Sequence, residues 1–416
     1  MKKLLLVVSF VFIFSPIIIF GSMKIKDEIN FNKKEKQEKE LVSKIKSYYS
    51  EYVETIKETK LYKNVNSKYE EYGNISKGVK LKLKEEDINS KTKYFHIDGL
   101  DLYIKYDSVK KIDKFNKNER YKYYIAFNKN IKTNNSTSFY NSDKELLYTL
   151  NDSIDLPILV LDDEYSGVVY NDELLYIKNS DGTIYRKENN SSNKSKIRVL
   201  TYHFLYDEKS EKCDQEICYT LTQFEENAKY LRENEYFTMK LDELELYLDG
   251  KINIPEKSIV LTIDDGTIFN LKVIDILEKY KVNLTMFVIT GIVKADDKKS
   301  EYLDLESHTD NMHNQYECPG YGMQGGGILC LPEEKVLSDL KKSQEKLGGS
   351  KYFAYPFFDF NDRAIQLLKK AGFNMAFIGQ YDSDGYSYPN RTNKYLVRRK
   401  TVFSDLTEKE FIEYIS

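Results

Sequence analysis

The chain has 416 residues, which is long enough for two or three domains. Its formal net charge is −3, and charged residues of both signs make up 31% of the sequence. This balance lacks the basic footprint of nucleic-acid-binding proteins, so we expect no nucleic-acid partner. Tyrosine is abundant throughout, with 35 residues, and is therefore a weak functional signal by itself.

The N-terminal segment is apolar and follows two lysines. Residues 4–20 are interrupted only by Ser9, Ser15 and Pro16. This length lies between a signal-peptide core and a minimal membrane-spanning helix. We predict an export signal over residues 1–23, and favour a retained anchor over a cleaved peptide because no clear A-x-A site follows. The protein would then lie at the extracytoplasmic face of the cell membrane, or be secreted to the cell wall. A buried N-terminal helix is a weaker alternative, because the segment has no amphipathic period.

Residues 24–72 are rich in lysine and glutamate. Their apolar residues recur at roughly helical spacing: Leu41, Ile45, Tyr48, Tyr52 and Ile56. The pattern predicts a helical juxtamembrane stalk. A plain solvated helix with the same charges explains it as well.

Residues 73–188 change to a period of two. The stretches GVKLKLK and LDLYIKY alternate apolar and polar residues, and Asp, Asn and Gly turns separate further short strands. We predict a β-rich accessory region that fits one or two SH3-like barrels. Its tyrosines could stack on sugar rings, but a structural role fits them better. A polar linker is predicted at residues 189–196.

Residues 197–416 alternate between strands and helices. The predicted strands are 197–206, 258–265, 283–290, 352–357 and 375–379, and the predicted helices are 220–234, 268–280, 333–348 and 362–372. Apolar strands alternating with helices predict an α/β fold with a parallel sheet covered by helices. At roughly 220 residues a barrel is the natural architecture, with catalytic residues at the C-terminal strand ends.

Two adjacent carboxylates, Asp264 and Asp265, end the apolar strand SIVLTIDD. Alone, DDG is more often a turn. His308 and His313 lie five residues apart, a spacing that on a helix separates side chains by about 140°, so the imidazoles converge only from a strand-to-loop corner. Two imidazoles and one carboxylate form a divalent-metal site, and the second carboxylate is then available as a base. The acid pair must lie at a bend, where we expect Gly266 to permit the turn.

The four cysteines have two local pairs. An even number outside the cytoplasm favours disulfides, and the simplest pairing joins Cys213 to Cys218 and Cys318 to Cys330. A four-cysteine zinc site lacks its usual CxxC spacing, and unpaired buried thiols are the third alternative. The glycine-rich stretch between the second pair lacks a G-K-[ST] ending, so we expect no nucleotide.

The motifs LTIDDG, TMFVIT, SHTDNMH and FAYPFFDFND follow one another in order, after YHF at residues 202–204. Together they resemble the polysaccharide deacetylase domain (NodB homology, carbohydrate esterase family 4) over residues 197–416, about half of the chain. The resemblance implies a distorted (β/α) barrel of the NodB-homology type. Many members have H-[ST]-x-x-H, whereas H-T-x-x-x-H here resembles the branch that deacetylates poly-β-1,6-N-acetylglucosamine.

The resemblance also implies residue roles. Asp264 would be the general base, and Asp265, His308 and His313 would bind a divalent cation. Zn²⁺ suits this ligand set, and Co²⁺ or Ni²⁺ would bind comparably. The metal and a backbone N–H near Phe357 would stabilise the oxyanion of the acetamide under attack.

Three further residues belong to these motifs with less defined roles. Tyr355 and Pro356 precede Phe357 in the motif expected to contact substrate. His203 would flank the site, and a hydrogen-bonded core histidine is the alternative.

Two motifs depart from the family pattern. Ala354 stands where many members have an arginine that tethers the base, and no histidine follows His313 to supply a late general acid. Arg398 falls where related branches carry a site arginine, so we expect it to orient Asp264 or bind substrate. An always-charged guanidinium is a poor acid.

These features predict a membrane-anchored, metal-dependent hydrolase that removes acetyl groups from N-acetylglucosamine of a cell-envelope glycan. Peptidoglycan is the favoured substrate, because the β-rich region suits attachment to the wall. The histidine spacing favours poly-β-1,6-N-acetylglucosamine instead. An inactive glycan-binding wall protein is a further hypothesis, motivated by the missing arginine and histidine. Hydrolysis of small esters or of xylan acetyl groups would use the same site.

Overall fold

The computed structural model describes residues 8–188, 193–266, 272–293, 300–320, 322–379 and 384–416, with side chains from residue 28 onward except at 322–325. The chain divides into two units. Unit 1 comprises Met1–Glu119, Ile131–Leu156 and Glu164–Tyr185, and unit 2 comprises Arg120–Asn130, Pro157–Asp163 and Arg186–Ser416. Two segments of the predicted β-rich region therefore belong with the C-terminal half.

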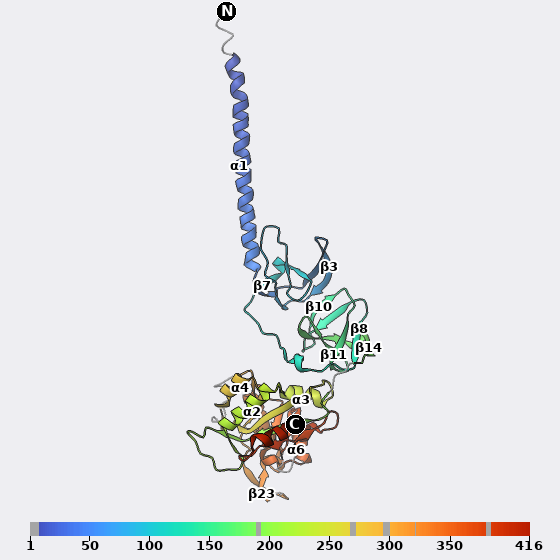
Figure 1. Cartoon of the computed structure of the whole chain (residues 1–416), viewed down its shortest axis with the longest axis vertical. Coiled ribbons are helices and arrows are strands. Elements are labelled where there is room, and N and C mark those ends of the chain that lie inside the picture. The colour runs from blue at the N-terminus through green and yellow to red at the C-terminus, as the bar shows by residue number, and fades with distance from the viewer. Residues whose placement is uncertain (1–7, 189–192, 267–271, 294–299, 321, 380–383) are drawn as a thin grey trace, which may run out of the picture. The chain divides into compact units, whose positions relative to one another are not determined.

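One long helix, α1 (Val8–Tyr48), opens the described chain (Figure 1). The predicted helical stalk over residues 24–72 is too long, because strands begin at Tyr52. From there Val53 and Thr55 are fully buried while Tyr52 and Glu54 are half-buried, which is the period of a strand. The two-residue period thus begins some twenty residues before the predicted start of the β-rich region.

The predicted anchor over residues 1–23 lies partly outside the described residues, which begin at Val8. Among the helices in the described part of the chain, none contains a stretch long and apolar enough to span a lipid bilayer.

Fourteen short strands follow α1 and build the β-rich part. They are β1 (Tyr52–Thr55), β2 (Thr59–Val65), β3 (Lys68–Ile75), β4 (Lys80–Lys82), β5 (Tyr94–His96), β6 (Tyr103–Lys105), β7 (Val109–Lys111), β8 (Lys129–Thr133), β9 (Thr137–Tyr140), β10 (Leu146–Leu150), β11 (Asp155–Leu161), β12 (Tyr165–Tyr170), β13 (Glu173–Lys178) and β14 (Gly182–Arg186). One sheet has the order β4-β1-β7, and the other has the order β14-β8-β11-β12-β13-β9-β10-β3-β2-β6-β5.

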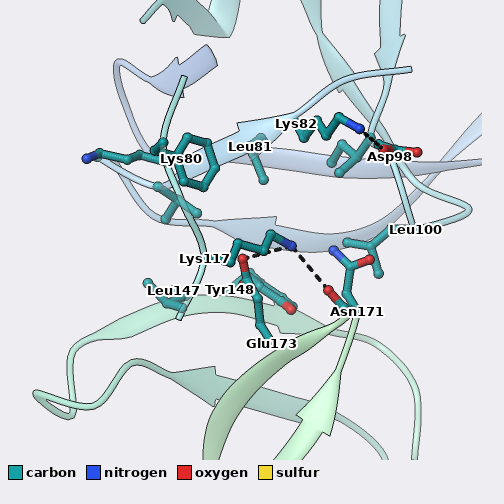
Figure 2. Close-up of a pocket in the computed structure, with 14 residues that line it drawn as sticks. Lys80, Leu81, Lys82, Asp98, Leu100, Lys117, Leu147, Tyr148, Asn171 and Glu173 are labelled. Atoms are coloured by element: carbon teal, nitrogen blue, oxygen red, sulfur yellow. Dashed lines mark hydrogen bonds and ion pairs between the residues drawn. The ribbon is translucent and has the colours of Figure 1, made fainter. Parts of the chain in front are cut away.

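A pocket of about 180 Å³ opens within unit 1, where β4 faces the turn between β12 and β13 (Figure 2). Lys82 pairs there with Asp98 at 3.0 Å. Lys117 pairs with Glu173 at 2.9 Å and also donates to the backbone oxygen of Asn171. These lysines and carboxylates are therefore paired with one another, and the pocket contains none of the residues predicted for the active site.

The predicted linker at residues 189–196 is only partly described, because residues 189–192 lie outside the described residues. The following two residues, exposed Asn193 and buried Lys194, form hydrogen bonds within unit 2. The Asn193 side chain accepts a hydrogen bond from the backbone N–H of Ile254, and Tyr247 donates its hydroxyl proton to the backbone oxygen of Lys194.

The described residues of unit 2 from Asn193 onward contain thirteen strands and six helices, and the unit also includes parts of β8 and β11. The strands are β15 (Ile197–Tyr202), β16 (Phe204–Tyr206), β17 (Cys218–Thr220), β18 (Phe237–Thr238), β19 (Ser258–Gly266), β20 (Leu284–Val288), β21 (Leu303–Ser307), β22 (Gln315–Cys318), β23 (Gly322–Gly326), β24 (Tyr352–Ala354), β25 (Met375–Phe377), β26 (Tyr386–Ser387) and β27 (Lys400–Thr401). The helices are α2 (Leu221–Glu233), α3 (Leu241–Leu248), α4 (Ile274–Tyr280), α5 (Glu333–Lys346), α6 (Asp362–Ala371) and α7 (Glu408–Ile415). The predicted strands and helices all have counterparts here, although the predicted start of α4 lies outside the described residues.

A parallel sheet forms the centre of unit 2, in the order β25-β24-β21-β20-β19-β15. One C-terminal segment pairs with both edges of this parallel run. Val397 forms a parallel bridge with Phe377 next to β25, and β27 pairs in parallel with β15. This segment brings the residues between Val397 and Thr401 close to the centre of the sheet.

Helices bury their apolar faces on this sheet in two clusters. Helices α2, α4 and α7 pack against β15, β19 and β20. Helices α5 and α6 pack against β24 and β25. Helix α2 begins with a capping box in which the Thr220 side chain accepts from the backbone N–H of Gln223. The sheet is thus covered by helices, as the β–α alternation of the sequence predicts.

A candidate metal and acid–base site

The acid pair lies where β19 loses its regular geometry. The pairing of β19 with β20 shifts register between Ile263 and Gly266, and Asp265 has a φ of 61°. In a regular strand adjacent side chains point to opposite faces, so the irregularity lets both carboxylates serve one site. The left-handed residue is Asp265 itself, which corrects the role expected for Gly266. The glycine lies close to its neighbours, because an added Cβ would be 3.0 Å from the Met286 side chain.

Asp265 and the two predicted histidines converge. The Oδ1 atom of Asp265 lies 3.3 Å from Nε2 of His308 and 3.0 Å from Nε2 of His313. Ligands at 2.0–2.2 Å around a tetrahedral ion are separated by about 3.4 Å, so both separations match a shared cation. Their potential ligand atoms all lie within 4.8 Å of one another, and the residues fit a divalent metal.

The orientation of His308 supports this fit. Its Nδ1 atom lies 2.9 Å from the backbone oxygen of Ala354, to which an Nδ1–H group donates. That tautomer leaves the Nε2 lone pair directed at Asp265, as second contacts of metal-binding histidines do. The His308 side chain is 2% exposed. Ala354, which stands in the place of the missing arginine, thus contributes its backbone.

The second carboxylate, Asp264, is held by an arginine. Arg399 donates from its two terminal nitrogens to the two oxygens of Asp264, at 2.6 Å each. Both side chains are buried. Burial raises the pKa of Asp264, but the charges of Arg399 and His308 outweigh it, so the pKa lies below its usual value. Asp264 is therefore ionised at neutral pH.

The arginine predicted for this role, Arg398, is the wrong residue. Arg398 is exposed, whereas Arg399 is fully buried. Val397, Arg399 and Thr401 alternate as the buried residues of the segment that pairs with β25 and β15. This period of two, anchored on the apolar Val397, is the sequence signal that identifies Arg399.

The FAYPFF motif forms one wall of the site. Phe357 has a φ of 57°, its ring is half-exposed, and it lies 4.7 Å from the His313 ring between centroids. Tyr355 is fully buried, its backbone N–H donates to Phe377, and its hydroxyl donates to the backbone oxygen of Tyr395. The expectation that Tyr355 contacts substrate is therefore wrong. Pro356 is also buried, and begins the turn that presents Phe357.

Left-handed backbone conformations gather at this site. Besides Asp265 and Phe357, Thr309 has a φ of 78° and Phe358 a φ of 61°. Such conformations are strained for residues with a side chain and persist where surrounding contacts enforce them. The concentration of strain beside the histidines and the acid pair is typical of functional sites.

His203 lies beside the same group. It follows β15 and packs edge-on against Phe358, with ring centroids 5.8 Å apart. Burial lowers the pKa of His203, although the charges of Asp264 and Asp265 oppose this. The imidazole is therefore neutral at neutral pH, in a position that flanks the acid pair.

Both local cysteine pairs are joined. Disulfides link Cys213 to Cys218 and Cys318 to Cys330. The second closes the hairpin of β22 and β23, which follows the histidine motif. The backbone N–H of Gly326 in this hairpin donates to Asp359, two residues after Phe357. The loop between the cysteines is thereby attached to the FAYPFF wall.

Comparisons with known proteins agree with the motifs. Residues 251–376 match the family model described as polysaccharide deacetylase. A poly-beta-1,6-N-acetyl-D-glucosamine N-deacetylase of Staphylococcus aureus (strain MRSA252) is 26% identical over 291 residues, which cover 64% of this chain and 94% of that protein.

Solved structures are also similar at low identity. A de-N-acetylase from Aggregatibacter actinomycetemcomitans is 20% identical, with a TM-score of 0.44 over 53% of this chain and 99% of that chain. IcaB from Ammonifex degensii is 22% identical, with a TM-score of 0.43 over 54% of this chain and 97% of that chain. The family match thus identifies a polysaccharide deacetylase domain that includes residues 251–376 of this chain.

Proposed function

We propose that the chain is a metal-dependent N-deacetylase of poly-β-1,6-N-acetylglucosamine or a closely related exported glycan. The observation that carries this proposal is the convergence of Asp265, His308 and His313 beside the buried Asp264–Arg399 pair. Three ligands with one ionised base next to them are the parts that amide hydrolysis needs. We also propose that the parallel sheet of unit 2 forms a distorted barrel, which the segment around Arg399 closes.

A divalent cation on Asp265, His308 and His313, most simply Zn²⁺, would polarise the acetamide carbonyl and make a bound water easier to deprotonate. Asp264 takes the proton from the attacking water. Arg399 occupies one lone pair on each oxygen of Asp264, so a further lone pair remains for this proton. The carboxylate is held in place by its partner, and its position costs no rearrangement during the reaction.

The tetrahedral oxyanion and the leaving amine need one donor each. Phe357 presents its backbone in a left-handed turn beside His313, and we assign its N–H to the oxyanion. No histidine follows His313 in the sequence. The protonated Asp264 therefore returns its proton to the amine, while acetate leaves.

The choice of glycan rests on the relatives. The Staphylococcus aureus protein is named for poly-β-1,6-N-acetylglucosamine, and most of its length matches this chain. The five-residue spacing of His308 and His313 favours the same substrate. Peptidoglycan, favoured by the sequence analysis because of the β-rich region, has no support from these relatives and serves as the competing substrate in the test.

The test is acetate release by the full chain from poly-β-1,6-N-acetylglucosamine and from peptidoglycan in parallel. Wild type is compared with Asp264→Asn and with Asp275→Asn, an exposed aspartate on α4, each with Zn²⁺ and with a chelator. We expect chelator-sensitive release from the first glycan, lost in Asp264→Asn and retained in Asp275→Asn. Acetate release from peptidoglycan alone would overturn the substrate assignment. Absence of both acetate release and bound metal would favour an inactive glycan-binding protein.

A further inference from the structure

We propose that one polar face of helix α5, formed by Asp339, Ser343 and Lys346, positions the loop between the two histidines and thereby sets the affinity of the site for its cation. The inference rests on the proposed function, because it assumes that His308 and His313 bind metal. The three residues are positioning residues, since Asp339 and Lys346 contact the loop, Ser343 contacts the residue before it, and none contacts the ligand atoms.

The three side chains share one side of the helix. They are separated by four and then three residues within α5 (Glu333–Lys346), and this spacing places side chains on one helical face. Leu340 and Val336 on the same helix are fully buried in the core of unit 2. The apolar contacts therefore fix the helix, and the polar face is held rigidly toward the histidine loop.

Asp339 binds the loop backbone directly. Its two oxygens accept hydrogen bonds from the backbone N–H groups of Asp310 and Asn311, at 2.7 Å each. Hydrogen bonds to an ionised carboxylate are about twice as strong as neutral ones. Two consecutive N–H groups on one carboxylate fix the orientation of the peptide midway between His308 and His313.

Lys346 holds the same loop through a side chain. It pairs with Asp310 at 2.5 Å and donates to the backbone oxygen of Thr290 at 3.2 Å. Asp310 is 2% exposed and also accepts from the Thr290 hydroxyl. A carboxylate so deeply buried requires such partners, so loss of Lys346 leaves it poorly compensated.

Ser343 contacts the residue just before the first histidine, at the end of β21. Its hydroxyl lies 2.7 Å from the hydroxyl of Ser307, and both side chains are fully buried. The Ser307 oxygen in turn accepts from the backbone N–H of Thr309, which has the left-handed φ of 78°. Helix α5 thus supports the strained turn that directs the chain from His308 toward His313.

These contacts account for the convergence of the two imidazoles. Residues five apart in a loop have no regular geometry that brings them together, so the loop must be held from outside. Contacts of this kind around metal ligands typically change metal affinity by roughly 10- to 100-fold when removed. Asp339, Ser343 and Lys346 therefore support the metal site although none of them is a ligand.

The test measures cation affinity and does not need glycan turnover. The dissociation constant for Zn²⁺ is determined by competition with a chromophoric chelator, and the absorption spectrum of Co²⁺ reports the ligand geometry. The variants are Asp339→Ala, Asp339→Asn, Ser343→Ala and Lys346→Met. Matched controls are Ser338→Ala and Lys341→Met, which change exposed residues of the same helix.

We expect roughly 10- to 100-fold weaker Zn²⁺ binding in Asp339→Ala, with a changed Co²⁺ spectrum, and a smaller loss in the isosteric Asp339→Asn. The controls keep wild-type affinity. If Asp339→Ala does not fold, Asp339→Asn and Ser343→Ala decide the question. Wild-type affinity in folded variants overturns this inference alone, whereas absence of binding in the wild type overturns the proposed function with it.

Discussion

Arg399 and Asp264 form a two-point ion pair that is buried in the centre of unit 2, with 0% and 1% of their side chains exposed. A guanidinium that matches both carboxylate oxygens fixes the direction of the carboxylate as well as its charge. Arg399 lies far along the chain from Asp264, and the segment that pairs with both edges of the parallel sheet carries it there. The orientation of the Asp264 carboxylate thus depends on the pairing of this C-terminal segment with the sheet.

Replacement of Arg399 tests this relationship. Arg399→Lys keeps a positive charge but loses the planar fork, so we expect kcat to fall by about 100-fold because the base is misplaced. The pKa of Asp264 should rise when the guanidinium is lost, and the acidic limb of kcat/KM should move to higher pH. Arg398→Lys, at the exposed neighbouring position, is the control. Equal effects of the two substitutions would contradict the assignment.

The same pair contributes to stability. Arg399→Met leaves a buried carboxylate without its partner, and we expect a loss of about 3–5 kcal/mol in the free energy of unfolding. Because the folded pKa of Asp264 is depressed, the stabilisation is present above the unfolded pKa and is lost as pH falls through the folded value. Chemical denaturation at about pH 7 measures the loss, and a change below about 1 kcal/mol would show that Asp264 is not buried as described.

Gly291, in the segment after β20, also supports the histidine loop. Its backbone N–H donates to the Asp310 oxygen at 2.8 Å, and a Cβ at this position would collide with that oxygen and with the Asn311 side chain. We expect Gly291→Ala to lower stability by about 1–3 kcal/mol and to weaken Zn²⁺ binding.

The control for Gly291 is Gly349→Ala. Gly349 has a φ of 104° with open space around it, so alanine there adds backbone strain without a collision. Its cost should be about 1 kcal/mol, with unchanged Zn²⁺ affinity. Metal affinity measured by chelator competition separates the two variants. Unchanged affinity in Gly291→Ala would show that the loop position does not matter for the metal.

Glu306 makes stability depend on pH. Burial raises its pKa to about 7, although its carboxylate accepts hydrogen bonds from Ser350 and from the backbone N–H groups of Lys351 and Tyr352. The folded state then holds the proton more tightly than the unfolded state. The stabilisation is full below the unfolded pKa near 4.5 and is lost as pH rises through about 7.

Glu306→Gln should therefore remove part of this pH dependence. The amide oxygen of glutamine accepts the same hydrogen bonds without a charge. We therefore expect the free energy of unfolding to increase by on the order of 3 kcal/mol at about pH 8 and to change little at about pH 4. Glu301→Gln, an exposed neighbour, should have no such effect. Denaturation curves across this pH range measure it, and parallel curves for wild type and Glu306→Gln would refute the assignment.

Phe357 is an exposed apolar residue beside His313. Its ring is 38% exposed and lies beside His313, so a sugar ring bound at the metal would pack against it. Phe357→Ala should raise KM by roughly fivefold, for a loss of about 1 kcal/mol of contact, with kcat less affected. Ile292→Ala, at another strongly exposed apolar residue, is the control. A loss confined to kcat would assign Phe357 to the chemistry instead.

The grouping of Asp265, His308 and His313 was predictable because histidine is rare in this chain and the strand before the acid pair is distinctive. The chain has only four histidines, and the acid pair ends a continuous apolar strand. Parallel strands end at one edge of a sheet, so the two motifs were expected to meet. The site could be named before the fold was known.

Other features depended on pairing between distant segments. Arg399 and Arg398 differ only in which side of an irregular segment they occupy, and this is decided by contacts with β25 and β15. The sequence predicts a helix where the strands begin at Tyr52, because the lysine, glutamate and tyrosine residues there fit the period of a helix as well as that of a strand. Their burial alternates only once β1 pairs with β4 and β7. No sequence motif marks Asp339, Ser343 or Lys346. Their role follows only from the contacts of α5 with the segment around the histidines.

The most direct test of the account is anomalous diffraction at the zinc absorption edge from crystals of the full chain grown with Zn²⁺. We expect one strong peak bounded by Oδ1 of Asp265 and the Nε2 atoms of His308 and His313, next to the carboxylate of Asp264. No peak at these three residues, or zinc bound only elsewhere on the chain, would contradict the metal site and the proposed deacetylase mechanism with it.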